Sequence, residues 1–267
     1  MLFTVIIPTY NRNDLLKKCL DALALNIEKI NQPFEVIITD DSHGNVAKEL
    51  VAVYPWATWL AGAKKGPAAN RNIAAKNAKG KWLVFTDDDC LPSENWLKTY
   101  ADAFIANEFM VYEGLTKADR KQLRFDEEAP INLTGGKLWS CNFAISSSLF
   151  RTLNGFDETF PYAAMEDIDF YMRVSQKATI YFLPEACVVH PWRKAKPFGS
   201  FKKHIRSHKH FNKIHGNPKE IYNYRITRLK ILIGYSFSGF KQLAKFHFKG
   251  YAYYIEHLYI SLILIFV

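Results

Sequence analysis

Short apolar runs alternate with amphipathic stretches along the first part of the chain. Residues 3–7, 34–39 and 82–86 are mostly apolar and β-prone, which predicts buried strands. Residues 13–23 between the first two carry apolar side chains at helical spacing, and residues 45–51 and 67–78 also predict helices, the last opened by Pro67. Strand–helix alternation predicts an α/β fold with a mostly parallel, Rossmann-like sheet flanked by helices.

The pattern continues with more irregular spacing. We expect a helix capped by Ser93, then strands over residues 110–116, 138–146 and 179–183. A helix beginning near Glu166 is predicted to bury Ile168 and the apolar positions that follow it. Residues 118–137 are polar and glycine-containing, which is typical of a mobile loop that closes over a substrate.

Polar side chains follow three of the predicted strands. Residues 9–12 follow the first strand, Asp40 and Asp41 follow the second, and Asp87, Asp88 and Asp89 follow residues 82–86. Ligands of open α/β sheets bind beyond the carboxyl ends of the strands. The three clusters therefore predict a ligand site at one sheet edge.

Three consecutive carboxylates repel one another and need a cationic partner. Alternation along the backbone would direct Asp87 and Asp89 to one ligand and Asp88 away from it. A hard divalent ion, Mg²⁺ or Mn²⁺, takes one or two carboxylates and leaves room for substrate phosphates. The alternative is a solvated acidic turn before a helix. For Glu166 and Asp167, the alternative to catalysis is interaction with a helix dipole.

Charge is unevenly distributed. The 267 residues carry a net charge of +9, yet residues 193–230 contain eight Lys and four Arg against one acid, Glu220. Such a segment suits an anionic surface. The four scattered cysteines and the N-terminus without a basic region predict a cytosolic protein with reduced thiols and no signal peptide.

The C-terminal part turns apolar and aromatic after residue 231 and ends in LYISLILIFV, which is too short to span a bilayer. We expect a helical, basic and aromatic extension over residues 196–267 that attaches to the cytoplasmic face of a membrane. Packing on the catalytic domain or on a second subunit is the alternative. Another alternative is a nucleic-acid-binding module without catalysis, because basic residues interleaved with aromatics also bind single strands.

The ordered motifs FTVIIPTYNR, FEVIITDDS, GPAANRNIAAKNAKGKWLVFTDDDCLP, CNFAIS, LNGFDETF, MEDIDFYMRV and VVH resemble the family 2 glycosyltransferases with the GT-A fold. The resemblance covers residues 1–195. It implies an inverting enzyme that moves a sugar from a nucleoside-diphosphate sugar to a hydroxyl of a glycan or lipid-linked acceptor, in cell-surface polysaccharide or glycolipid synthesis. No nucleic-acid partner is expected from it.

The resemblance also implies roles for individual residues. Those matching the donor-binding positions of the family are Pro8, Thr9, Tyr10, Asp40, Asp41, Arg71, Asn72, Asp87 and Asp88. Asp87 and Asp89 match the DxD pair that holds Mn²⁺ or Mg²⁺, and His190 matches a histidine near the metal or diphosphate. Asp167, with Glu166 beside it, matches the catalytic base. The chain departs from the family at Ser42 and His43, where Gly-Ser commonly follows the aspartate.

Overall fold

The computed structural model describes residues 1–106, 108–196 and 198–267, which form two compact units. The first unit consists of Met1–Asp119, Pro130–Glu158 and Glu166–Pro191. The second consists of Arg120–Ala129, Thr159–Met165 and Trp192–Val267.

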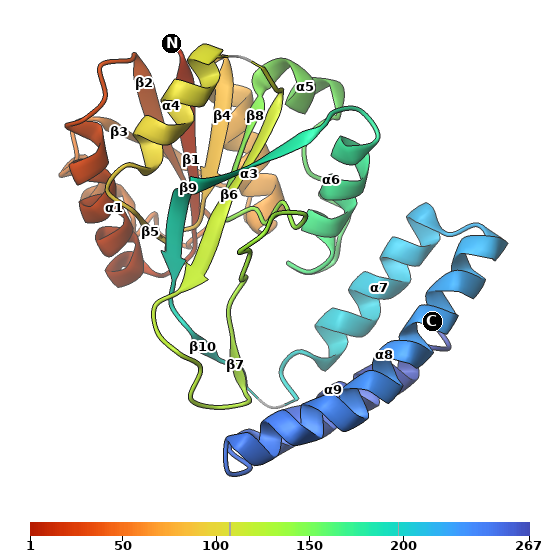
Figure 1. Ribbon diagram of the computed structural model, residues 1–267. Coiled ribbons are helices and arrows are strands. Elements are labelled where there is room, and N and C mark those ends of the chain that lie inside the picture. Colours follow the sequence, from red (N-terminus) through yellow and green to blue (C-terminus); the bar gives the residue numbers. More distant parts are fainter. Residues whose placement is uncertain (107, 197) are drawn as a thin grey trace. The chain divides into compact units, whose positions relative to one another are not determined.

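In its described residues, the first unit contains an eight-stranded mixed sheet in the order β3-β2-β1-β4-β8-β6-β9-β5 (Figure 1). Its strands are β1 (Phe3–Thr9), β2 (Phe34–Asp40), β3 (Ala57–Ala61), β4 (Trp82–Thr86), β5 (Leu91–Pro92), β6 (Val111–Ala118), β8 (Asn142–Ser146) and β9 (Ile180–His190). The first four are parallel, whereas β8 and β5 run antiparallel to their neighbours. The carboxyl ends of β1, β2 and β4 therefore meet at one edge.

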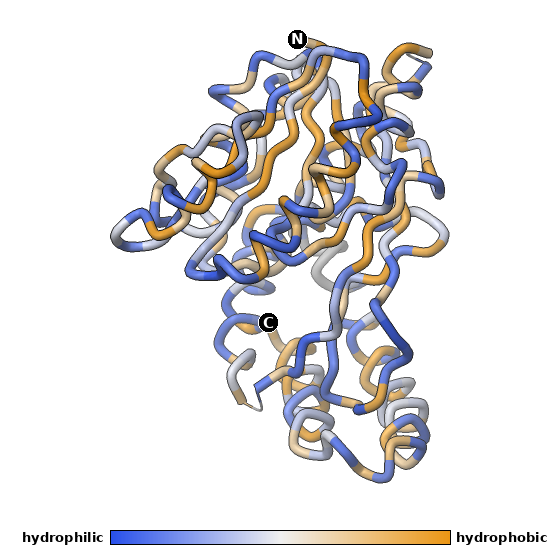
Figure 2. The backbone as a smooth tube through the Cα atoms, turned by 90° about the vertical axis from the view of Figure 1, so that its left-hand side faces the viewer, coloured by the Kyte–Doolittle hydropathy of each residue, from blue (hydrophilic) through white to orange (hydrophobic). Residues whose placement is uncertain are grey.

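Helices cover both faces of this sheet. They are α1 (Asn13–Ile27), α2 (Lys48–Ala52), α3 (Pro67–Asn77), α4 (Trp96–Ala106), α5 (Ser147–Thr152) and α6 (Glu166–Ser175). Side chains alternate across a strand, so Val5 belongs to the apolar cluster that includes Leu16 of α1, and Ile6 to a second cluster that includes Phe170 of α6. Figure 2 shows the resulting concentration of apolar residues along the central strands.

The strands predicted over residues 3–7, 34–39 and 82–86 are confirmed, as is the buried face of α1 formed by Leu16, Cys19, Leu20 and Leu23. The helix predicted to be capped by Ser93 begins later, at Trp96. The Ser93 N–H instead donates to the Cys187 carbonyl at 2.9 Å, next to the short edge strand β5 that pairs with β9. This pairing between segments far apart in the sequence keeps residues 91–93 extended.

Two other expectations are wrong in detail. The predicted strand over 138–146 starts only at Asn142, because Leu138 has a φ of +46° and its N–H donates to the buried Glu113 carboxylate. Helix α6 exposes Ile168 and buries Asp169, whose carboxylate pairs with Arg173 at 2.6 Å. A charge paired one helical turn away can be buried at a position where the apolar pattern predicts an exposed side chain.

The second unit contains α7 (Phe201–His215), α8 (Pro218–Lys245), α9 (Tyr251–Ile263) and a small antiparallel pair, β7 (Glu127–Glu128) with β10 (Arg193–Lys194). Its apolar cluster joins Phe125 to Leu243, Tyr253 and Tyr254. The predicted helical C-terminal extension is thus present. Within the described ranges, no helix is both long and apolar enough to cross a membrane. A domain boundary near residue 195 stays a prediction.

Candidate active site

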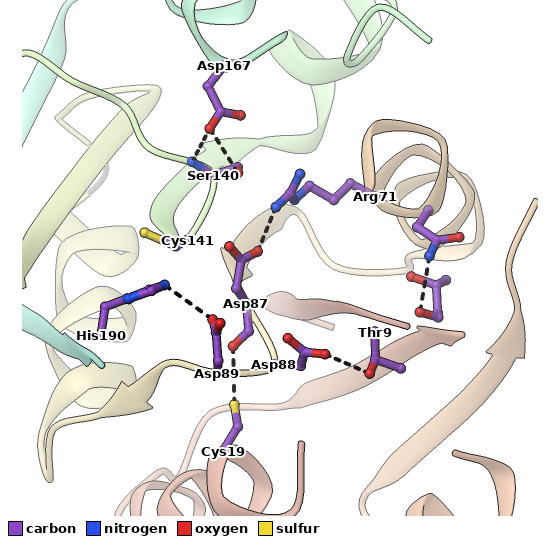
Figure 3. A network of polar contacts seen from close by, with 12 residues as sticks. Thr9, Cys19, Arg71, Asp87, Asp88, Asp89, Ser140, Cys141, Asp167 and His190 are labelled. Atoms are coloured by element: carbon purple, nitrogen blue, oxygen red, sulfur yellow. Dashed lines mark hydrogen bonds and ion pairs between the residues drawn. The ribbon is translucent and has the colours of Figure 1, made fainter. Parts of the chain in front are cut away.

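The three aspartates after β4 point in three directions (Figure 3). Asp87 accepts a hydrogen bond from Arg71 at 2.6 Å. Asp88, which is fully buried, accepts one from the Thr9 hydroxyl at 2.7 Å. Asp89 faces His190, whose Nε2 lies 3.4 Å from a carboxylate oxygen. The turn therefore connects α3, β1 and β9 through three separate carboxylates.

Two arginines form ion pairs with the three adjacent carboxylates. Arg12 bridges Asp88 at 2.6 Å and Asp89 at 3.2 Å. Arg71 pairs with Asp87 at 2.6 Å. The acidic turn is therefore an ion-paired network and not a solvated cap, with three carboxylates against two guanidinium groups.

Arg71 is almost completely buried on α3. Its Nη2 bonds Asp87, but its Nε and Nη1 have no hydrogen-bond partner among the described residues. Burial disfavours its charge, yet the nearby carboxylates of Asp87 and Asp167 outweigh that effect and raise its pKa. Buried donors without partners cost free energy, so this guanidinium is built to receive further acceptor oxygens.

Asp167 lies in the first turn of α6 and faces Ser140. The Ser140 hydroxyl donates to Oδ2 at 3.2 Å, and the backbone N–H approaches the same atom at 3.4 Å. Oδ1 has no hydrogen-bond partner in the described parts of the chain. Burial raises the pKa of Asp167, Arg71 partly lowers it, and Asp87 raises it further. A carboxylate with a raised pKa and an unused oxygen has the properties of a general base.

Neighbouring Glu166 is buried at the start of the same helix.

His190 ends β9 with a defined tautomer. Its Nδ1 lies 2.8 Å from the Pro191 carbonyl, which only accepts, so Nδ1 carries the proton. Burial lowers the pKa of His190, which favours the neutral ring. With the proton on Nδ1, Nε2 presents its lone pair 3.4 Å from an Asp89 oxygen, an arrangement that a cation bound to both atoms would stabilise.

Asp89, Cys90 and His190 each place a ligand atom within 4.8 Å of the others. Carboxylate and imidazole suit Mn²⁺, and carboxylate suits Mg²⁺, so this pair of residues fits a divalent ion. The Cys90 thiol is a poorer candidate. A hydrogen bond with Cys141, together with burial, raises the pKa of Cys90, and a thiol must lose its proton to bind a metal.

Other predicted donor-binding residues hold loops in this structure. Asp41 accepts from the backbone N–H groups of Lys64 and Gly66 at 2.6 and 2.7 Å. Asp40 accepts from Ser42 and Ala47 at 2.8 and 3.0 Å.

Burial opposes the charge on Asp40, but hydrogen bonds led by those from Ser42 lower its pKa. Asn72 bonds the backbone of Phe156 through both its oxygen and its nitrogen. Pro8 is buried on β1, and Tyr10 just beyond it is half exposed.

Two residues of the site carry no role in the sequence-based prediction. Arg12 belongs to the polar group after the first strand, but nothing in the sequence pairs it with Asp88 and Asp89. Ser140 falls inside a stretch predicted as strand, and the sequence contains no signal for its contact with Asp167.

A model of the glycosyl transferase family 2 matches residues 4–154, which is more than half of the chain. An uncharacterized glycosyltransferase of Haemophilus influenzae is 26% identical over 193 residues, covering 66% of this chain and 63% of the relative. The poly(ribitol-phosphate) beta-glucosyltransferase of Bacillus spizizenii is 34% identical over 110 residues, covering 38% of this chain and 17% of that protein. The chain thus spans less than two thirds of these relatives' lengths.

Solved structures share the fold. TarS of Staphylococcus aureus, residues 1–349 in complex with UDP-GlcNAc, superimposes with a TM-score of 0.61 at 22% identity, covering 89% of this chain and 73% of that one. The mannosyltransferase PcManGT of Pyrobaculum calidifontis, in complex with GDP-Man and Mn²⁺, gives 0.52 at 19% identity, covering 78% and 61%. With its mixed sheet and ordered motifs, and with the family match over residues 4–154, the chain belongs to glycosyl transferase family 2.

Proposed function

We propose that this protein is an inverting glycosyltransferase that moves a sugar from a nucleoside-diphosphate sugar to a hydroxyl of a glycan or lipid-linked acceptor. The observation that carries the proposal is the position of Arg71. Its charge acts on Asp87 of the acidic turn and on Asp167 of α6, while two of its nitrogens have no partner among the described residues. One cation therefore links a place for donor phosphates to a candidate base.

Asp167 acts as the base in this proposal. Its Oδ1 accepts the proton of the acceptor hydroxyl as that oxygen attacks the anomeric carbon, and Ser140 holds Oδ2 in place. A positioned general base contributes about 10²–10⁴-fold to the rate. Attack on the face opposite the leaving diphosphate inverts the configuration in one displacement, so no protein nucleophile is required.

The donor is proposed to lie along the sheet edge. Pro8, Thr9, Tyr10 and Asp41 are assigned to the nucleoside, and the open N–H groups of Arg71 to the diphosphate. Asp40 and Asn72 support this pocket by holding its loops.

Asp89 and His190, with Asp87 close by, would hold a divalent ion, Mn²⁺ or Mg²⁺. When bound, such an ion supplies neutralisation of the diphosphate charge. The Mn²⁺ in the PcManGT complex supports this assignment.

The donor and acceptor classes draw support from the relatives. TarS and PcManGT are complexed with UDP-GlcNAc and GDP-Man, both nucleoside-diphosphate sugars. Two named relatives act on poly(ribitol-phosphate). We therefore assign the reaction to cell-surface polysaccharide or glycolipid synthesis. The basic segment 193–230 further supports peripheral association with an anionic membrane on its cytoplasmic face.

A thermal-shift panel tests the donor assignment. Sugars carried by UDP, GDP and dTDP are compared with and without Mn²⁺, since a ligand that binds the folded state raises the melting temperature. We expect one base to give a shift that grows with Mn²⁺. If none of these donors shifts the protein, while single-stranded RNA binds with steep salt dependence, a nucleic-acid-binding function replaces the proposal.

A further inference from the structure

Helix α8 of the second unit carries an exposed row of apolar side chains. Ile226, Leu229, Ile233, Phe237 and Phe240 recur every three or four residues and are 37–71% exposed. At 3.6 residues per turn this spacing places them on one face. A soluble helix normally turns such a face inward, so this row is not explained by packing within the unit.

Helix α9 carries a second row of the same kind. Tyr251, Ile255, Tyr259, Leu262 and, just past the helix end, Phe266 are 38–74% exposed. The residues of α9 that pack inward are others, including Tyr253, Tyr254 and Ile260. Hydrophobic and hydrophilic residues alternate along both helices (Figure 2).

The two rows lie on one side of the α8–α9 hairpin. The helices meet through Tyr235, Gly239 and Tyr254, where the missing side chain of Gly239 admits the Tyr254 ring. At 100° per residue, the row on each helix lies about a third of a turn around the helix axis from the residues of this contact. Followed along the chain, the direction of that rotation is the same for both helices. Because the helices run antiparallel, equal offsets of the same sense place both rows on the same side.

Helix α7 contacts α9 away from these rows. His204 and Ser200 reach His257 and Glu256, which lie on other faces of α9. Among the described residues, Tyr259 at the margin of its row stacks on Phe201, and Phe240 meets Phe248 edge-on. The rows therefore form one continuous exposed surface, called here the hairpin face.

Charge in the α8–α9 hairpin is mainly positive. Residues 218–267 contain seven Lys and Arg against two acids, Glu220 and Glu256. Glu256 is buried and accepts from Ser200 and from the Phe198 backbone. Lys230, Lys241 and Lys245, by contrast, are exposed.

A second copy docking on this face would bring its lysines against like charges, which disfavours self-association. Anionic headgroups above an apolar layer match both the lysines and the apolar rows.

We propose that the hairpin face is the surface that inserts into the headgroup region of an anionic lipid bilayer. The inference rests on the peripheral membrane association proposed above. The membrane contact is made by two antiparallel helices. Their aromatic and aliphatic rows enter the boundary between headgroups and acyl chains, and the lysines bind lipid phosphates. Residues 193–217, the part of the basic segment that precedes α8, then add long-range attraction and are not the inserting surface.

Vesicle flotation of the full chain tests the assignment. The vesicles contain phosphatidylcholine alone or mixed with phosphatidylglycerol. Wild-type protein should float with the anionic vesicles, and Phe237→Ser combined with Phe240→Ser should weaken that binding about tenfold or more. A matched control, Val53→Ser with Ile105→Ser, removes equally exposed apolar groups from the first unit and should bind like wild type.

A charge variant separates the two contributions. Lys230→Gln with Lys241→Gln should weaken binding to anionic vesicles by about fivefold per lysine and leave binding to neutral vesicles unchanged. If the wild-type protein and the Phe variant float equally well, the protein binds membranes but the hairpin face is not the inserting surface. If wild type never floats and forms dimers that the Phe variants dissolve, the face is a protein interface. Nucleotide-sugar binding, measured in parallel, reports separately on the catalytic proposal.

Discussion

Ser140 directs both its hydroxyl and its backbone N–H at one oxygen of Asp167, and the other oxygen of that carboxylate has no partner within the described residues. The contact fixes the orientation of the candidate base without occupying the atom that would accept a proton. It also favours the charged carboxylate, which opposes the rise in pKa caused by burial.

Ser140→Ala should therefore raise the pKa of Asp167 further, by up to about one unit for one hydrogen bond. Transfer requires the charged carboxylate, so the acidic limb of the pH–rate profile should move to higher pH. Steady-state rates across pH test this, with the exposed Ser148→Ala as the control. A limb that stays in place, or moves to lower pH, would contradict the positioning role of Ser140.

Asp167→Asn keeps the shape of the side chain but removes the proton acceptor. We expect sugar transfer to fall by at least about 10²-fold while donor binding changes little. Glu166→Gln is the comparison, because both acids begin the same helix. An inactive Glu166→Gln enzyme beside an active Asp167→Asn enzyme would reverse the two assignments.

Arg71→Gln should weaken nucleoside-diphosphate binding about tenfold or more, because charge-assisted hydrogen bonds contribute about 1.5–3 kcal/mol each. Calorimetric titration with the diphosphate measures the affinity. Arg151→Gln, which removes an exposed arginine of α5, controls for the change in net charge. Equal loss in both variants would show that the effect is long-range and not due to the buried guanidinium.

Asp89→Ala should abolish the part of diphosphate binding that depends on Mn²⁺ while the fold survives, because the residue lies in a turn after β4. Titrations with and without Mn²⁺ give the metal-dependent part of the affinity. Cys90→Ser should retain it, because the wild-type thiol stays protonated. Unchanged metal dependence in Asp89→Ala would remove this residue from the metal site.

The sequence predicts the parts of the fold that depend on local pattern. The strands around Val5, Ile37 and Val84 and the family motifs at their ends are continuous in the chain, so their apolar runs and acids are visible directly. The edge strand at Leu91 forms only because β9 returns beside it. The turn at Leu138 forms only because the Glu113 carboxylate accepts hydrogen bonds from the backbone N–H groups of that turn. Such contacts between distant segments have no local pattern.

The same distinction applies to the site. Asp89 and Asp167 stand at element ends and match family motifs, so their candidacy follows from the sequence. Their hydrogen-bonding partners cannot be predicted in this way, because Arg12 is 77 positions from Asp89 in the sequence and Ser140 is 27 positions from Asp167. Pairing at such separations is decided by how the strands are ordered in the sheet.

The second unit is assembled from three stretches of chain, with Phe125 packed against Tyr254 and β7 paired with β10. Ending the gene after residue 196 would keep β10 beside β7 but remove the partners of Phe125, Glu128 and Phe160, which lie on α7 and α9. A truncation at one point in the sequence therefore cannot separate the two units. Point substitutions in the full-length chain are the better test.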